Sequence, residues 1–174
     1  MGKDRIEKVK VVLFLSISIL FFSCKKEVIE KKTDFVKTWY DTEKIIPFEA
    51  TLKINEDNTF EYYGGACDSQ FESSGTWFVK NDTIILNSKI PSECMAMTEF
   101  GKMCYSKEEI EKIRFTRTIK NCKTTSNKEF NNFSNEKFYI KNDSLVFKKD
   151  KKDTCTGFEM VFSNTIKSRN NNKN

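Results

Sequence analysis

The stretch Trp77-Phe78-Val79-Lys80-Asn81-Asp82-Thr83-Ile84-Ile85-Leu86 decides the fold of this chain of 174 residues. β-Branched and aromatic residues, which favour strands, lie on both sides of Lys-Asn-Asp, where the chain is expected to turn. The pattern therefore predicts a β-hairpin. The stretch Phe138-Tyr139-Ile140-Lys141-Asn142-Asp143-Ser144-Leu145-Val146-Phe147 repeats it. Whether the two stretches descend from a duplication or share only a favourable turn, they predict a meander of antiparallel strands.

Strand signals continue on both sides of these hairpins. Apolar and polar residues alternate over 48–54 and 59–62, around the turn-forming residues 55–58. This alternation predicts a further hairpin with one buried and one solvated face. Residues 158–162 alternate in the same way and are expected to form the last strand.

One helix is expected between the second and third hairpins. Ser106 is followed at the third position by Glu109, which is the pattern of a capping box at the start of a helix. The helix is expected to end near Ile113. The next residues, 113–120, alternate between apolar and polar side chains and are expected to form a strand.

These elements predict a mainly β fold class, with a single antiparallel meander of about eight strands that closes into a small barrel, since closure removes exposed sheet edges. Residues 52–62, Cys67, residues 74–77 and residues 82–86 carry a resemblance to a known family. The chain resembles the small lipocalin-like lipoproteins of Bacteroidetes-type envelopes. It is also similar to the small N-terminal barrel of the copper-homeostasis and envelope-stress lipoproteins. Thr38-Trp39-Tyr40 stands where a lipocalin barrel opens with Gly-x-Trp.

The N-terminus carries an export signal. The first ten residues are net positive, and residues 11–22 then carry no charge. Twelve residues are too few to cross a bilayer as a helix but suit the apolar core of a secretory signal. Ser23-Cys24 after this run resembles the lipobox of bacterial lipoproteins, in which the cysteine becomes the first mature residue and carries acyl chains such as palmitate. The alternative is an ordinary signal, or a short anchor helix, in which Cys24 is incidental.

This resemblance implies the following organisation. Residues 1–23 are the signal peptide, and residues 24–34 are the lipidated cysteine with a polar tether. Residues 35–163 are the barrel domain, and residues 164–174 are a disordered polar tail. Three acyl chains would hold the protein permanently at a membrane, since each buried CH2 contributes about 0.8 kcal/mol. The implied location is the cell envelope, at the outer membrane of a Gram-negative bacterium.

Composition excludes several functions. The sequence contains no histidine, which removes Ser–His–Asp and Cys–His catalysis and any histidine-based zinc site. The net charge is +5, and the basic residues are scattered among acidic ones instead of forming the basic face that nucleic acid requires. We therefore expect a protein that is not an enzyme and binds no nucleic acid.

Five cysteines remain beyond Cys24, and an exported compartment favours their pairing. Cys94 and Cys104 flank one loop and are the first expected pair. The second pair is expected among Cys67, Cys122 and Cys155, which leaves one thiol without a partner.

The same loop suggests a second chemistry. It brings together two thiols and three thioethers, soft ligands that select Cu(I): Cys94, Met95, Met97, Met103 and Cys104. The alternative is a disulfide with methionines that fill gaps in the barrel.

The predicted strand over 113–120 places Arg117 on the same face as Ile113, Phe115 and Ile119. If that face points into the barrel, Arg117 could hold an anionic group of a ligand while Trp77 and Phe115 line the pocket. The alternative is that Arg117 is solvated. The leading expectation is a lipid-anchored barrel that binds a small apolar molecule inside or an envelope protein outside. The alternative function is an envelope stress or Cu(I) sensor that uses residues 94–104.

Overall fold

The computed structural model describes residues 32–42, 48–66, 68–102, 104–124, 126–149 and 159–166. The chain divides into two compact units, Met1–Phe35 and Val36–Asn174. Residues 32–35 of the first unit are helical. The expected signal peptide, Cys24 and most of the expected tether and tail lie outside the described residues.

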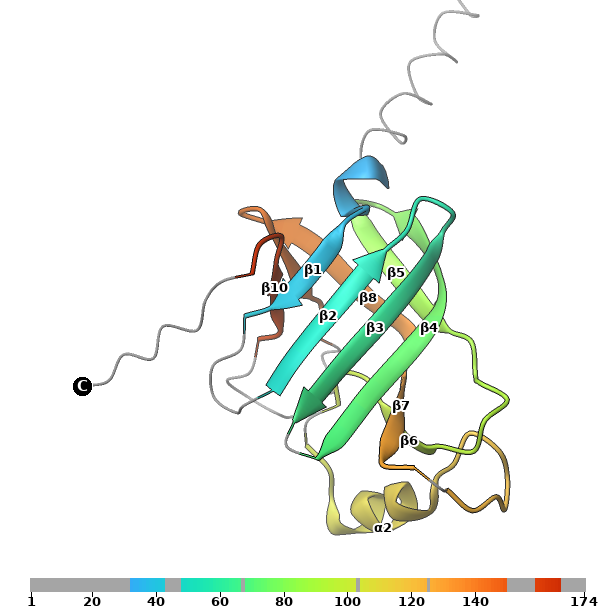
Figure 1. The fold of residues 1–174 in the computed structure, drawn as a ribbon. Helices are drawn as coiled ribbons and strands as arrows, with labels where there is room; N and C mark the ends of the chain where they lie inside the picture. The colour runs from blue at the N-terminus through green and yellow to red at the C-terminus, as the bar shows by residue number, and fades with distance from the viewer. Residues whose placement is uncertain are drawn as a thin grey trace, which may run out of the picture. The chain divides into compact units, whose positions relative to one another are not determined.

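The second unit is built almost entirely of strands. One nine-residue helix, α2, is the exception within its described part (Figure 1). The elements in chain order are β1 (Thr38–Asp41), β2 (Phe48–Ile54), β3 (Thr59–Ala66), β4 (Ser69–Lys80), β5 (Thr83–Ser88), β6 (Ala96–Glu99), α2 (Lys107–Phe115), β7 (Lys128–Asn132), β8 (Ser134–Lys141), β9 (Ser144–Phe147) and β10 (Val161–Ser163).

Eight of these strands form a closed antiparallel barrel. Their order is β3-β2-β1-β10-β9-β8-β5-β4, and a further pairing between β3 and β4 closes the ring (Figure 1). The predicted mainly β fold with a small closed barrel is therefore confirmed. Two extra strands extend the sheet beyond this ring, because β7 pairs in parallel with β4 and β6 pairs in parallel with β7.

The two Lys-Asn-Asp turns form as expected. Asn81 and Asp82 have φ of 49° and 57°, and Asn142 and Asp143 have φ of 50° and 57°. Positive φ at both central residues is the requirement of a type I′ turn, which matches the twist of the strands that it joins. Asn and Asp enter this region more readily than other residues with a Cβ. The two hairpins, β4–β5 and β8–β9, are confirmed, as is the β2–β3 hairpin.

Strand β4 changes its neighbour halfway along its length. Gln70–Glu72 pair with β7, whereas Gly75–Lys80 pair with β5. At the change of partner the two backbones lie very close, because a Cβ on Gly75 would lie 2.7 Å from the Cα of Ser88 and closer still to the carbonyl oxygen of Asn87. Glycine is therefore required at this position.

A serine joins the strands that separate at this point. The Ser88 hydroxyl accepts a hydrogen bond from the Phe133 N–H at 2.8 Å, and it lies 2.7 Å from the buried Ser73 hydroxyl of β4. These contacts satisfy the Phe133 N–H and the buried Ser73 hydroxyl at the point where the β4–β5 pairing ends.

Alternating side chains of the barrel strands form the core. Trp77 is fully enclosed, and its indole N–H donates to the Asn55 carbonyl at 3.0 Å. Other large buried side chains from the eight barrel strands include Trp39, Leu52, Ile54, Phe60, Tyr62, Ile84, Leu86, Phe138, Leu145 and Phe162.

The expected strand over 113–120 is wrong. Helix α2 occupies the first three of these positions and ends at Phe115. The residues after it make one isolated bridge, between Ala96 and Arg117. The predicted capping box is confirmed: Ser106 and Glu109 exchange side chain to backbone hydrogen bonds. Lys102 also donates to the Glu109 carboxylate, and these hydrogen bonds lower the pKa of Glu109 to about 2. The capped helix therefore forms where the alternating pattern predicted the start of a strand.

Candidate functional site

The interior of the barrel was the first candidate site, and aromatic rings fill one end of it. Phe100 follows β6 and Phe133 lies between β7 and β8, and their rings stack with centroids 3.9 Å apart. We call this pair the aromatic plug. Phe133 also contacts the rings of Phe60 and Tyr62, and Phe100 contacts Phe147. A small ligand was expected inside the barrel. Among the described residues, these aromatic side chains occupy one end of that interior.

Backbone geometry holds the plug in place. Gly101, directly after Phe100, has φ of +74°, a conformation that side chains with a Cβ rarely adopt. A Cβ there would also collide with the Phe147 ring, since it would lie 2.6 Å from Cε1 and closer still to Cζ. The chain can therefore turn tightly against the ring of Phe147 only because residue 101 is glycine.

Tyr62 is the titratable group beneath the plug. Burial raises its pKa above the ordinary range, the charge of Asp41 raises it further, and a hydrogen bond with the Asn131 side chain opposes the shift. Tyr62 thus stays protonated at neutral pH and is unsuited to act as a base. No sequence motif singles out this residue, because Tyr62 follows the ordinary alternation of β3.

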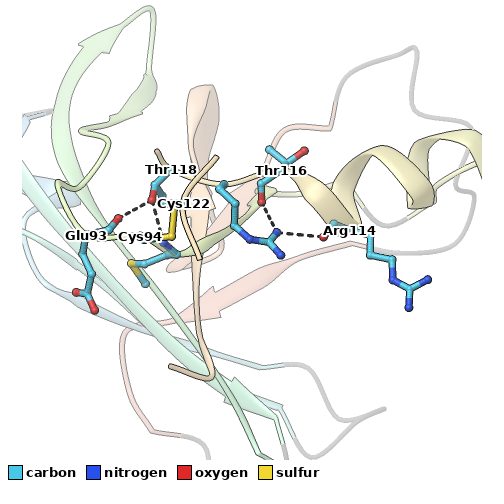
Figure 2. Close-up of a disulfide and its surroundings, with 8 residues drawn as sticks. Glu93, Cys94, Arg114, Thr116, Thr118 and Cys122 are labelled. Carbon is cyan, nitrogen blue, oxygen red and sulfur yellow. Dashed lines mark hydrogen bonds between the residues drawn. A yellow bond between two sulfur atoms is a disulfide. The ribbon is translucent and has the colours of Figure 1, made fainter. Parts of the chain in front are cut away.

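The segment between β5 and β8, residues 89–133, forms an arm that includes β6, α2 and β7 (Figure 1). A disulfide between Cys94 and Cys122 closes the base of this arm, with their Cα atoms 5.9 Å apart (Figure 2). Thr118 reinforces the closure, since its backbone N–H donates to the Met95 carbonyl at 3.1 Å and its hydroxyl accepts from the Met95 N–H at 2.9 Å.

The expected pairing of Cys94 with Cys104 is therefore wrong. Cys104 is also disulfide-bonded, but not to Cys94. The physical reason is that β6 follows Cys94 as an extended strand, which advances about 3.3 Å per residue and carries the chain away. The segment that follows α2 then brings Cys122 beside Cys94. Their Cα atoms lie 5.9 Å apart, within the range of about 4.4–6.8 Å that is usual for a disulfide. The expectations for Cys67 and Cys155 lie outside the described residues.

The expected Cu(I) ligands are not available as a set. Cys94 and Cys104 are both oxidised in disulfides, and the Met95 side chain is buried. Met97 lies half-buried on β6, and Met103 lies outside the described residues. Among the residues that the structure describes, no group of three or more Cys, Asp or Glu side chains could hold a metal ion.

Arg117 does not point into the barrel, which was one of the two positions considered for it. Its guanidinium donates to the carbonyl of Arg114 at 3.1 Å and to that of Thr116 at 2.8 Å. Arg117 therefore binds backbone carbonyls at the C-terminal end of α2, where unpaired carbonyls and the helix dipole favour a cation. Trp77 was expected to line a pocket and belongs instead to the packed core. The side chain of Phe115 is not among those that the structure describes.

A groove on the outer surface is the site that sequence reasoning missed. Its volume is about 480 Å³, and it lies where β4 changes its neighbour from β5 to β7. Its lining comes from β3, β4, the start of the arm and β7: Tyr63, Glu72, Ser73, Ser74, Lys89, Ile90, Pro91, Ser92 and Phe130.

Several contacts fix the shape of this groove. The Lys128 ammonium lies 3.2 Å from the Glu72 carboxylate, and the Lys89 N–H donates to the Ser74 carbonyl at 2.8 Å. Tyr63 and Ile90 project from the surface, with 53% and 54% of their side chains exposed. The groove thus combines an aromatic ring, both signs of charge and serine hydroxyls on rigid elements.

No protein-family model matches the chain, and no curated protein matches it. Within the described residues, no helix has the length and apolar character needed to cross a membrane.

Proposed function

We propose that this chain is a non-enzymatic bacterial lipoprotein, anchored by lipid on Cys24 at the outer membrane, whose outer surface binds an envelope protein. The export signal and the Ser23-Cys24 junction support the anchor. The absence of histidine from the sequence removes the commonest general base and supports a binding role over catalysis.

The packing of the barrel supports one of the two expected ligand classes over the other. A carrier of a small apolar molecule needs an interior cavity. Here the stacked rings of Phe100 and Phe133 lie against Tyr62 at one end of the barrel. This stacking is the observation that carries the proposal, because it leaves the outer surface as the better place for a partner.

The arm is the surface that we propose for the partner. It exposes the apolar side chains of Ile110 on α2 and Ile119 after it. The Cys94–Cys122 disulfide and the Thr118 hydrogen bonds hold the arm in one conformation, and such preorganisation reduces the entropy lost on binding. Cu(I) sensing is not favoured, since Cys94 and Cys104 are both in disulfides.

Replacing Cys24 with alanine is expected to abolish lipid attachment and release the protein from membranes, because no other residue receives the acyl chains. Metabolic labelling with an alkyne analogue of palmitate, followed by carbonate extraction of membranes, measures both effects. Ser23→Ala is the matched control, since it keeps a small residue before the cysteine. Labelling that persists in Cys24→Ala would contradict the anchor.

The partner can be tested in intact cells with a photoreactive amino acid. Placed at Ile110, it is expected to form one discrete crosslinked product, because this side chain is exposed on the proposed contact surface. Placed at Lys80, which is exposed at the end of β4, it is expected to form none. Equal crosslinking at both positions, or none at either, would exclude the arm as the contact surface.

A further inference from the structure

We infer that the outer groove, defined by the residues named for it above and including Tyr63, binds a saccharide of about the size of a hexose disaccharide. This inference goes beyond the proposed protein partner and does not depend on it. The groove has about 480 Å³ of volume, which falls within the range of about 300–1,000 Å³ typical of small-molecule sites.

The ring of Tyr63 provides an aromatic platform. Tyr62 and Tyr63 are neighbours on β3, so their side chains lie on opposite faces of the sheet. Tyr62 is buried in the barrel, whereas Tyr63 is half exposed on the outer surface. A tyrosine has an apolar ring and a polar hydroxyl, so it can contact the C–H face of a pyranose and hydrogen-bond to its rim.

Polar groups surround this platform. Glu72 lies directly opposite Tyr63 in the β3–β4 register, and Lys128 holds its carboxylate at 3.2 Å. Lys89 and Ser74 lie next to each other through the backbone hydrogen bond between them. A carboxylate accepts, an ammonium donates, and a serine hydroxyl does both. This mixture suits the hydroxyl groups of a sugar, each of which donates and accepts.

Two other occupants fit less well. A peptide that adds to a sheet needs a strand with unpaired backbone groups. Beside the groove strand β4 is largely paired, because Gln70–Glu72 pair with β3 on one side and with β7 on the other, and the Ser74 carbonyl accepts from the Lys89 N–H. An acyl chain would remove water from Glu72, Lys89 and Ser74 without replacing their hydrogen bonds, which costs free energy.

The test uses the full chain, purified in a detergent whose headgroup is not a sugar. The probes are cellobiose, maltose and N,N′-diacetylchitobiose, followed by saturation-transfer NMR and calorimetry. At least one of them is expected to bind with a Kd below about 5 mM, an affinity ordinary for a shallow site. Tyr63→Ala is expected to weaken this binding about tenfold, the loss typical of removing one stacking ring.

Phe78→Ala is the matched control. Phe78 is an aromatic residue on the outer face of β4 with 49% of its side chain exposed, and it does not line the groove. Its replacement is expected to leave the affinity unchanged, and Tyr63→Phe is expected to retain most of it because the ring remains. Failure of all three disaccharides to bind, an equal loss in Phe78→Ala, or binding of laurate in their place would overturn the inference.

Discussion

Replacing Gly75 with alanine is expected to lower the free energy of unfolding by about 4 kcal/mol or more, a size that single substitutions reach mainly through steric conflict or lost burial. The added Cβ would meet the backbone of Asn87 and Ser88. A flexible side chain could rotate away from such a contact, but a backbone cannot. Strands β4 and β5 would have to separate at the point where β4 also exchanges β5 for β7.

Urea unfolding followed by far-ultraviolet circular dichroism measures this effect. Gly65→Ala is the matched control, because it places the same methyl group in the neighbouring strand β3, where the nearest atom outside its chain neighbours is the Ser69 carbonyl oxygen at 3.3 Å. We expect this control to change the midpoint only slightly. A Gly75→Ala protein as stable as Gly65→Ala would show that the strands can move apart at little cost.

The second large effect is expected from Phe133→Ala, which should cost about 3–5 kcal/mol, the usual range for removing a buried phenylalanine ring. Phe133 is 1% exposed, and its ring contacts those of Phe60, Tyr62, Phe100 and Phe138. The neighbouring rings belong to barrel strands and to the arm. They cannot fill the space that the Phe133 ring leaves unless the sheet moves. A cavity should therefore remain.

Thermal and urea unfolding measure the loss of stability, and binding of benzene or xenon measures the cavity, since apolar cavities of this kind stay dry and accept such probes. Phe78→Ala is again the control, as its ring is half exposed and its loss should change stability little. If wild-type protein binds benzene as strongly as Phe133→Ala, the barrel already contains an open cavity and a carrier function gains support.

The barrel could be predicted because its signals are local. Each Lys-Asn-Asp turn lies between two short apolar runs, so one short stretch of sequence specifies both strands and their connection. The capping box at Ser106 is equally local, and the structure contains it. Closure then follows from the number of strands, because a ring removes the exposed edges.

The arm could not be predicted because its structure depends on contacts between residues that are far apart in the sequence. Strand β7 has the sequence Lys-Glu-Phe-Asn-Asn, which has little strand propensity, and it exists because β4 and β6 pair with it from both sides. The disulfide partner of Cys94 depends on where the chain returns after α2. Spacing along the sequence favoured Cys104, whereas position in space favours Cys122.

The outer groove was missed because four separate segments form it. One signal was nevertheless present. Tyr62-Tyr63 places two aromatic residues in succession within an alternating strand, so one of the two rings must point outward. That outward ring, Tyr63, is one of the side chains that line the groove.

The disulfide at the base of the arm has a consequence for proteolysis. Cys94 and Cys122 enclose α2, whose exposed lysines include Lys107 and Lys112. A protease that cuts the chain after either lysine produces two fragments that remain covalently joined. The N-terminal fragment keeps Phe100 and the C-terminal fragment keeps Phe133, so both halves of the plug stay attached to one molecule. A nicked protein can thus persist as one covalently joined molecule.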